Sequence, residues 1–205
     1  DEIPFDFTRR RMSVIVAKAG RRMLITKGAP EGVLEVCTGL ELGADGVDVR
    51  EMTPELKAAA LDEFVRLSSD GYRAVAVAYR TIGNGREVYS ISDESNMTFV
   101  GYVSFIDPPK ESTREALEQA EALGVEIKIL TGDNELVTAR ICERVGLKVK
   151  GVLMGQDVDS MDDDELAQRA EQATVCARLS PDQKDRVIAA LKKSGHVVGY
   201  MGDGI

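Results

Sequence analysis

The sequence predicts an α/β protein made of two parts, an α+β module followed by a parallel sheet with flanking helices. From about residue 98 onward, apolar runs of strand length alternate with segments of helix length, and repeated βα units form parallel sheets with right-handed crossovers. Before residue 98 the strand-like runs follow one another across short turns, as in antiparallel sheets.

The composition is that of a globular protein that can bury one good core or two small ones. The chain has 205 residues, of which 43% are hydrophobic and 30% are charged. No apolar run approaches the roughly 20 residues that span a bilayer, and Asp1–Pro4 lacks the pattern of a signal peptide. We therefore expect no part of this segment to enter a membrane.

Charge and cysteine usage narrow the function classes further. The net charge of −9 disfavours nucleic acid, whose phosphates would be repelled. Cys37, Cys142 and Cys176 are far apart and lack metal-ligand spacing. We expect them to be reduced thiols that fill the core.

The first part is expected to begin with a hairpin, because two β-rich runs meet at a turn containing Gly20. Pro30 suits the first turn of a short helix, and Thr53-Pro54 suits the N-cap and first position of a longer one. The expected elements are strands within 12–27 and at 72–80, helices from 30 and from 53 to 70, and a loop over 38–52.

The second part is expected to be a five-stranded parallel sheet. Its strands are predicted at 98–106, 125–130, 150–155, 174–179 and 196–201, and its helices at 112–123, 134–145, 161–173 and 181–194. The acidic run at 162–165 is interpreted as a favourable first helical turn rather than a metal site.

Polar side chains follow two of these strands. Thr131 and Asp133 come after the second strand and Asp203 after the fifth, and ligands bind at the carboxyl ends of parallel strands. With Lys184 they could form one phosphate-and-metal site. In the alternative, the loop at 131–134 is an ordinary strand–helix turn with Asp133 or Asn134 as its N-cap, the loop at 202–204 is a similar turn, and Lys184 lies on a solvated helix face.

The first part also contains candidate binding residues. Arg9-Arg10-Arg11 is compatible with nucleotide phosphates, with a solvated edge or, least of all, with nucleic acid. Phe7 could stack on a base, although periodicity alone favours a place in the core. Lys27-Gly28, at the end of a strand, would let a phosphate approach the backbone closely.

Over essentially its whole length the chain resembles the cytoplasmic portion of P-type cation-transporting ATPases. The resemblance rests on motifs in the family's order: DFTRRRMSV, KGAPE, GYRAVAVAYR, DPPK, TGDN, ARLSPDQK and MGDG. The opening segment is most similar to the magnesium-transporting subgroup, and calcium pumps have a related segment.

The resemblance implies that residues 1–97 are most of the nucleotide-binding domain, with ATP as its ligand. The implied nucleotide contacts in this domain are Phe7 on the adenine, charge near the phosphates from Arg9, Arg10, Arg11 and Arg73, and a pocket wall from Lys27 and Gly28.

Residues 98–205 resemble part of the phosphorylation domain, whose Rossmann-like parallel sheet is of the haloacid-dehalogenase type. By resemblance, Thr131 and Gly132 hold the transferred phosphoryl group, Asp133 orders the site, Lys184 neutralises charge and Asp203 binds Mg²⁺. Asp107 is expected at a hinge between the domains. Asp107 and Arg178 are also counted with the nucleotide-binding residues.

The chain also departs from the family's pattern. The Asp-Lys-Thr-Gly stretch that carries the nucleophile does not occur in it, and GDGxND is matched only as far as Gly204. We therefore expect a piece of a larger protein, inactive by itself, whose aspartyl-phosphate, transmembrane and actuator domains lie outside this chain.

The expected function is the ATP-binding and partial phosphorylation region of an ATP-driven cation pump, Mg²⁺-transporting, at the cytoplasmic face of a membrane. A calcium or other cation pump is the first alternative. A soluble haloacid-dehalogenase-like phosphatase and a non-catalytic nucleotide-binding module are the others, although the phosphatase would require an Asp-x-Asp pair on a first strand.

Overall fold

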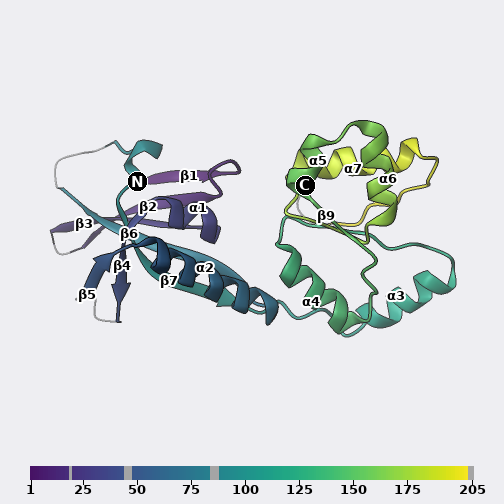
Figure 1. The fold of residues 1–205 in the computed structure, drawn as a ribbon, viewed down its shortest axis with the longest axis horizontal. Coiled ribbons are helices and arrows are strands. Elements are labelled where there is room, and N and C mark those ends of the chain that lie inside the picture. The colour runs from purple at the N-terminus through teal and green to yellow at the C-terminus, as the bar shows by residue number, and fades with distance from the viewer. Residues whose placement is uncertain (19, 44–47, 84–87, 203–205) are drawn as a thin grey trace. The chain divides into compact units, whose positions relative to one another are not determined.

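The computed structural model of the chain describes residues 1–18, 20–43, 48–83 and 88–202. These form two compact units (Figure 1). The first comprises Asp1–Leu67 with Tyr72–Phe105, and the second Ser68–Gly71 with Ile106–Ile205. The predicted fold class, α+β followed by a parallel sheet with helices, is confirmed.

The first unit is built on a seven-stranded mixed sheet in the order β1-β2-β3-β6-β7-β4-β5. All neighbouring strands are antiparallel except β4 and β7, which are parallel. The strands are β1 (Glu2–Asp6), β2 (Arg11–Lys18), β3 (Arg21–Gly28), β4 (Cys37–Leu42), β5 (Asp48–Glu51), β6 (Arg73–Ile82) and β7 (Met97–Phe105).

The predicted hairpin and the strand after residue 72 are confirmed as β2, β3 and β6, but the loop expected over 38–52 was wrong. That segment contains β4 and β5. Its glycines suggested a loop, yet Gly39 lies in a strand beside Thr98, whose hydroxyl would be 3.2 Å from an added Cβ. A side chain at this position would therefore press against the Thr98 hydroxyl.

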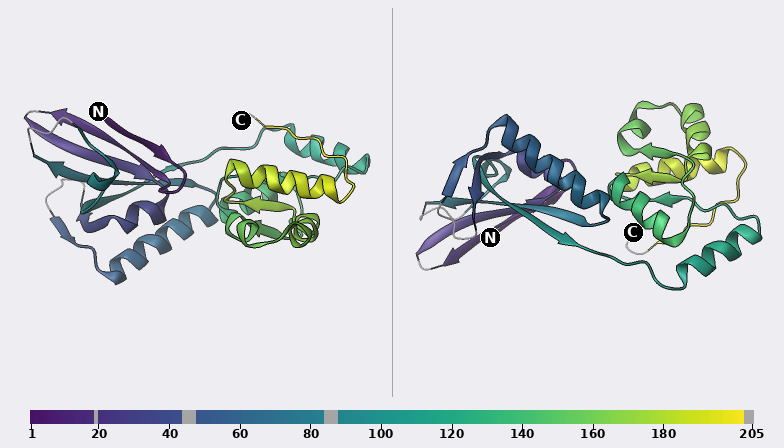
Figure 2. Two further views of the ribbon diagram at one scale, coloured as in Figure 1. Left: turned by 90° about the horizontal axis from the view of Figure 1, so that it is seen from above. Right: turned by 60° about the horizontal axis from the view of Figure 1, so that its bottom comes forward.

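Helices α1 (Pro30–Glu35) and α2 (Pro54–Ser69) cover one face of this sheet (Figure 2). The Thr53 hydroxyl accepts a hydrogen bond from the Leu56 N–H, as expected for its N-cap role. A short 3₁₀ helix, Ile91–Asp93, precedes β7. The buried core of the first unit consists of Ile3, Leu24, Val33, Leu34, Cys37, Ala76, Ala78, Met97 and Phe99.

The strand predicted to open the second domain belongs to the first unit instead. β7 pairs antiparallel with β6 from Phe105, opposite Arg73, to Thr98, opposite Tyr79. The two compact units therefore divide after residue 105, whereas the sequence analysis placed the boundary at 97/98. Apolar periodicity identifies a strand but does not identify its partner.

The second unit contains a three-stranded parallel sheet in the order β8-β10-β9. Its strands are β8 (Ile129–Leu130), β9 (Val152–Met154) and β10 (Val175–Ala177). Its helices are α3 (Thr113–Ala122), α4 (Glu135–Val145), α5 (Gly155–Ser160), α6 (Asp163–Gln172) and α7 (Pro181–Lys193).

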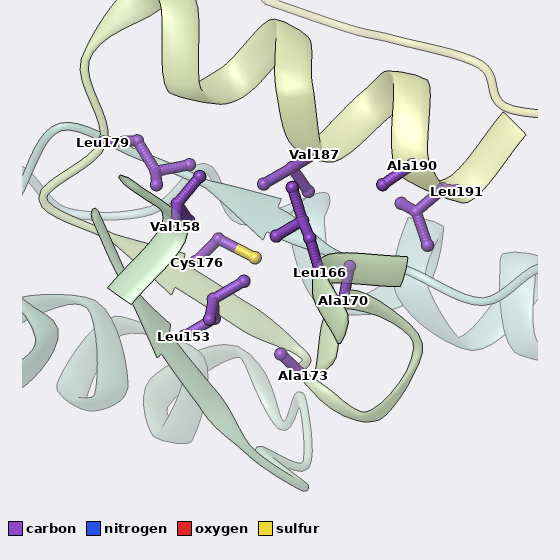
Figure 3. Close-up of a cluster of buried hydrophobic side chains, with 10 residues drawn as sticks. All are labelled: Leu153, Val158, Leu166, Ala170, Ala173, Cys176, Leu179, Val187, Ala190 and Leu191. Atoms are coloured by element: carbon purple, nitrogen blue, oxygen red, sulfur yellow. The ribbon is translucent and has the colours of Figure 1, made fainter. Parts of the chain in front are cut away.

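Alternate residues of β9 and β10 contribute to two separate cores. Leu153 and Cys176 pack with α5, α6 and α7, and Figure 3 shows Val187 of α7 pointing toward this cluster. Val175 and Ala177 pack instead with Cys142 of α4. The sheet is therefore covered on both faces, as parallel sheets generally are.

Several predictions for the second unit need correction. Residues 196–201, predicted as a fifth strand, have no regular structure, and Val197 and Met201 are fully exposed. An apolar run cannot form a strand without a hydrogen-bonded neighbour, and no described strand pairs with it. The short helix α5 was not predicted.

The acidic run and the cysteines behave as expected. The run forms the start of α6, where the Asp162 carboxylate accepts hydrogen bonds from the Asp164 and Glu165 N–H groups. All three cysteines are free and buried, and burial raises the pKa of the Cys176 thiol to about 11. No helix in the described ranges has the length and apolar character needed to cross a membrane.

Candidate functional site

A tight turn between β1 and β2 presents Phe7 to solvent. The Asp6 carboxylate accepts hydrogen bonds from the N–H groups of Thr8 (3.0 Å) and Arg9 (2.8 Å), and the Arg10 N–H donates to the Asp6 carbonyl (2.7 Å). Phe7 is 67% exposed and meets Phe5 edge to face, with ring centroids 5.2 Å apart. Phe7 is therefore outside the core, contrary to the interpretation that periodicity favoured.

The turn lies directly against the segment that carries Lys27 and Gly28. An added Cβ on Gly28 would be 2.3 Å from the Arg10 carbonyl oxygen, and one on Gly32 would be 2.6 Å from the Arg9 carbonyl oxygen. Only glycine fits such an approach of two backbones. Gly28 and Gly32 thus allow the turn with Phe7 and the arginines to lie against the segment with Lys27 and Gly28. The sequence analysis had treated these two segments separately.

Lys27 and Arg73 lie on the same face of the first sheet. Lys27 is opposite Val77 in the β3–β6 register, and Arg73 is on that side of β6 because alternate strand residues share a face. Both are exposed. Thr26 and Ala78, on the other side of the same strands, are buried.

Apolar side chains lie on the same face of the sheet as these two cations. The sequence analysis did not single them out: Val75 is opposite Val103, and Phe105 is opposite Arg73 in the β6–β7 register. Val103 is 47% and Phe105 is 53% exposed. We call the side of the sheet that carries Lys27, Arg73, Val75, Val103 and Phe105 the open face. The alternation in RAVAVAYR was the signal that would have revealed it.

The three consecutive arginines have different environments. Arg9 and Arg11 each form an ion pair with the fully buried carboxylate of Glu94, the Arg11 Nε lying 2.9 Å from it. Arg10 is exposed, and the structure records no side-chain partner for it among the described residues. Its φ of 51° is left-handed, which turns it away from its neighbours.

In the second unit, backbone hydrogen bonds join the loops that follow β8 and β10. The Thr131 N–H donates to the Cys176 carbonyl (2.9 Å), the Leu179 N–H to the Thr131 carbonyl (3.0 Å) and the Arg178 N–H to the Asp133 carbonyl (2.8 Å). The Thr131 hydroxyl accepts from the Asp133 N–H (3.1 Å). The structure thus brings together the TGDN and ARLSP motifs at one sheet edge.

Asn134, not Asp133, caps α4, since its side chain accepts from the Val137 N–H at 2.9 Å. Gly132 lies close to the second loop, because an added Cβ would be 3.4 Å from the Leu179 carbonyl oxygen. In the alternative interpretation, an ordinary strand–helix turn capped by Asp133 or Asn134, the cap is therefore Asn134.

The side chain of Arg178 also links the two loops. Its Nε donates to the Glu135 carboxylate at 2.8 Å. Burial opposes ionisation of Glu135, but hydrogen bonds from Arg178 and from a backbone N–H outweigh it, so the pKa of Glu135 lies below its usual range. Arg178 has a left-handed φ of 56°, and its carbonyl leaves no room for a Cβ on Gly155.

Lys184 lies in the first turn of α7, directly after the loop that contacts Thr131. The Ser180 and Gln183 side chains form a capping box that fixes this helix start. Lys184 is half-buried, with no recorded side-chain partner in the described part of the chain. A cavity of about 250 Å³, lined among others by Ile129, Thr131 and Asp133, adjoins the loop.

Asp107 is not among the residues that make these contacts. It lies in the exposed, irregular segment after β7. Asp203, the predicted Mg²⁺ ligand, is outside the described residues, and those described do not by themselves supply a metal-binding cluster.

Both units match known protein families. The P-type ATPase cytoplasmic domain N matches residues 1–112, and the haloacid dehalogenase-like hydrolase family matches residues 79–205. Together the two matches cover the whole chain in the order of the units described above. The chain belongs to the P-type ATPase family, of which it contains domain N and part of the phosphorylation region.

Curated relatives are similar over the full length of the chain. It is 44% identical to the magnesium-transporting ATPase, P-type 1, of Escherichia coli K12 and to that of Salmonella typhimurium LT2. It is 32% identical to calcium-transporting ATPase 1 of Lactococcus lactis. In each case the alignment covers all of this chain but only 22–23% of the relative.

The Glu135–Arg178 pair predicts a pH-dependent stability of the second unit. Because the folded-state pKa of Glu135 is lowered, the pair stabilises the fold above the unfolded pKa of about 4.3 and loses this contribution as pH falls through the folded-state pKa. Urea unfolding at pH 7 and pH 3, followed by NMR signals of the second unit, measures the change.

Glu135→Gln should lose stability at pH 7 and show a smaller drop between pH 7 and pH 3. Glu118→Gln, at an exposed position of α3, serves as the control and should keep the pH dependence of the unmodified chain. Equal pH dependence in all three proteins would contradict the role of the pair.

Proposed function

We propose that the first unit binds ATP on its open face. The observation that carries this proposal is that Lys27 and Arg73 share one side of the sheet with exposed apolar side chains, while the turn against Gly28 carries the exposed ring of Phe7. An adenine ring needs an apolar and aromatic surface, and the phosphates need cations. The match to domain N supports the same ligand.

Within the arginine triplet, Arg10 is the residue proposed to face the phosphates. Arg9 and Arg11 are held by Glu94, so their charge is largely compensated inside the unit. Arg10 is exposed beside Gly28, which its own backbone carbonyl approaches. Its guanidinium can therefore pair with a phosphate without breaking an ion pair.

The second unit is proposed to hold a phosphoryl group at the joined loops. Thr131 would donate its hydroxyl, Gly132 would offer its backbone N–H, Asp133 would order the loop and Lys184 would neutralise charge. Mg²⁺ would bind at Asp203 and would supply further charge neutralisation there. The phosphorylated aspartate would come from outside these residues. Arg178 and Asp107 would contribute to nucleotide binding.

For the whole protein, we propose an ATP-driven Mg²⁺ pump at the cytoplasmic face of a membrane. The proposal is supported by 44% identity to two proteins named magnesium-transporting ATPases, against 32% to one named a calcium-transporting ATPase. Its partners would be membrane and actuator domains. By itself the segment is proposed to bind ATP without turnover.

ATP binding is tested by calorimetric titration of the chain and of two variants. Phe7→Ala should weaken binding by roughly 1–3 kcal/mol, the range for loss of one base–aromatic stack. Lys27→Ala should weaken it through the loss of a charge-assisted contact, worth about 1.5–3 kcal/mol. Phe7→Tyr, which keeps the ring, should retain the affinity.

Arg21→Ala is the matched control for the lysine, since Arg21 is exposed at the other end of β3. It should leave the affinity unchanged. No saturable binding by the folded chain would overturn the proposal, and so would equal losses in Arg21→Ala and Lys27→Ala. Steady hydrolysis of phosphate esters would favour a soluble phosphatase.

The assignment to a magnesium pump is tested by a segment exchange. This chain should replace the matching segment of the Escherichia coli magnesium-transporting ATPase and sustain growth in medium low in Mg²⁺, because the two are 44% identical over the segment. The corresponding segment of the Lactococcus lactis calcium-transporting ATPase is the control and should sustain less growth. A chimera that reaches the membrane in normal amount but does not support growth would contradict the assignment.

A further inference from the structure

The first unit contains a buried carboxylate that the proposed function does not use. The Glu94 side chain has no exposed surface and lies between the 3₁₀ helix Ile91–Asp93 and β7. It accepts hydrogen bonds from Arg9, from the Arg11 Nε (2.9 Å) and from the Ser13 hydroxyl (2.7 Å). A charge removed from water this completely requires such a set of donors.

Each arginine also donates to a backbone carbonyl on a different segment. The Arg9 Nη2 donates to the Pro4 carbonyl in β1, at 2.8 Å. The Arg11 Nη1 donates to the Gly32 carbonyl in α1, also at 2.8 Å. One carboxylate thus connects the strand that leads into the Phe7 turn with the helix that follows Lys27 and Gly28.

A third connection runs between the strands beneath this turn. The Ser13 hydroxyl, which donates to Glu94, also lies 2.7 Å from the Thr26 hydroxyl on β3. Both hydroxyls are buried on the side of the sheet opposite the open face. Through Ser13 on β2 and Thr26 on β3, the carboxylate therefore links these two strands next to Lys27.

Burying this carboxylate and its arginines costs desolvation free energy, which points to a role beyond stability. Buried ion pairs often stabilise a fold no better than apolar side chains of similar volume, but they specify one geometry. Here the geometry that is specified is that of the Phe7 turn relative to the Lys27–Gly32 segment. The same ion pairs keep the side chains of Arg9 and Arg11 largely out of solvent.

We propose that Glu94 is a positioning residue for nucleotide binding. It holds the turn with Phe7 and Arg10 and the segment with Lys27 and Gly28 in one fixed arrangement, and it removes the charge of Arg9 and Arg11 from the phosphate side. This inference rests on the proposed ATP site on the open face. Glu94 itself lies beneath the site and does not touch the nucleotide.

The test is the affinity of the chain for ATP in a Glu94→Gln variant, measured below its thermal transition. The glutamine keeps the shape but loses the charge, so the two arginines are no longer held. We expect the Kd for ATP to rise about tenfold, as for a displaced binding group. Tyr102→Phe is the control: it removes a 2.7 Å hydrogen bond to the Ala60 carbonyl of the same unit and should keep the Kd.

Arg11→Gln is the second variant, because it removes the Arg11 contacts with Glu94 and with the Gly32 carbonyl but leaves Arg9 paired with Glu94. It should also raise the Kd for ATP, even if Glu94→Gln does not fold. Without nucleotide, amide NMR signals of residues 6–10 and 28–32 should shift in both variants and stay in place in Tyr102→Phe. These signals report the arrangement independently of ATP.

The outcomes separate this inference from the function on which it rests. An unchanged Kd in a folded Glu94 or Arg11 variant overturns the positioning role and leaves ATP binding intact. Unmoved amide signals in both variants also overturn it. No ATP binding by the unmodified chain overturns the proposed function and, with it, the role of Glu94.

Discussion

The alternation of side chains across β3, β6 and β7 is the constraint on which the first unit depends. One side of these strands carries Leu24, Thr26, Ala76 and Ala78, which are buried beneath α1 and α2. The other side is left for Lys27, Arg73 and the apolar residues of the open face. A shift of one residue in register would exchange the two sets, burying the cations and exposing the core.

Close contacts between backbone segments also determine how the first unit is arranged. Gly28 and Gly32 allow the Phe7 turn to lie against the strand end, where a Cβ at either position would collide with a carbonyl oxygen. In the second unit Gly155 has the corresponding role beside Arg178. In both units, segments that are far apart in the sequence come into contact because the glycine at the contact has no side chain.

Local chemistry made much of the fold predictable. The N-cap at Thr53, the acidic first turn at 162–165 and the apolar periodicity predicted the long helices and most strands, because these signals act within a few residues. Partner choice was not predictable: the strand at 97–105 pairs with β6, and the apolar run at 196–201 pairs with no described strand. Both outcomes depend on distant segments.

The candidate site shows the same limit. The motifs identified Phe7, Lys27, Thr131 and Lys184, but nothing in the arginine triplet distinguished its members. That distinction comes from Glu94, more than 80 residues away in the sequence. The apolar residues of the open face were also missed, because a half-exposed valine in a strand has no chemical signature of its own until its neighbours are known.

The measurement that tests the central claim most directly is amide NMR mapping of the chain during addition of ATP. The account predicts that the perturbed signals lie on the turn around Phe7, on Lys27 and Gly28, and on Arg73, Val75 and Val103 of the open face. Perturbations confined to α1, α2 or the second unit would contradict it, since they would place the nucleotide away from the open face.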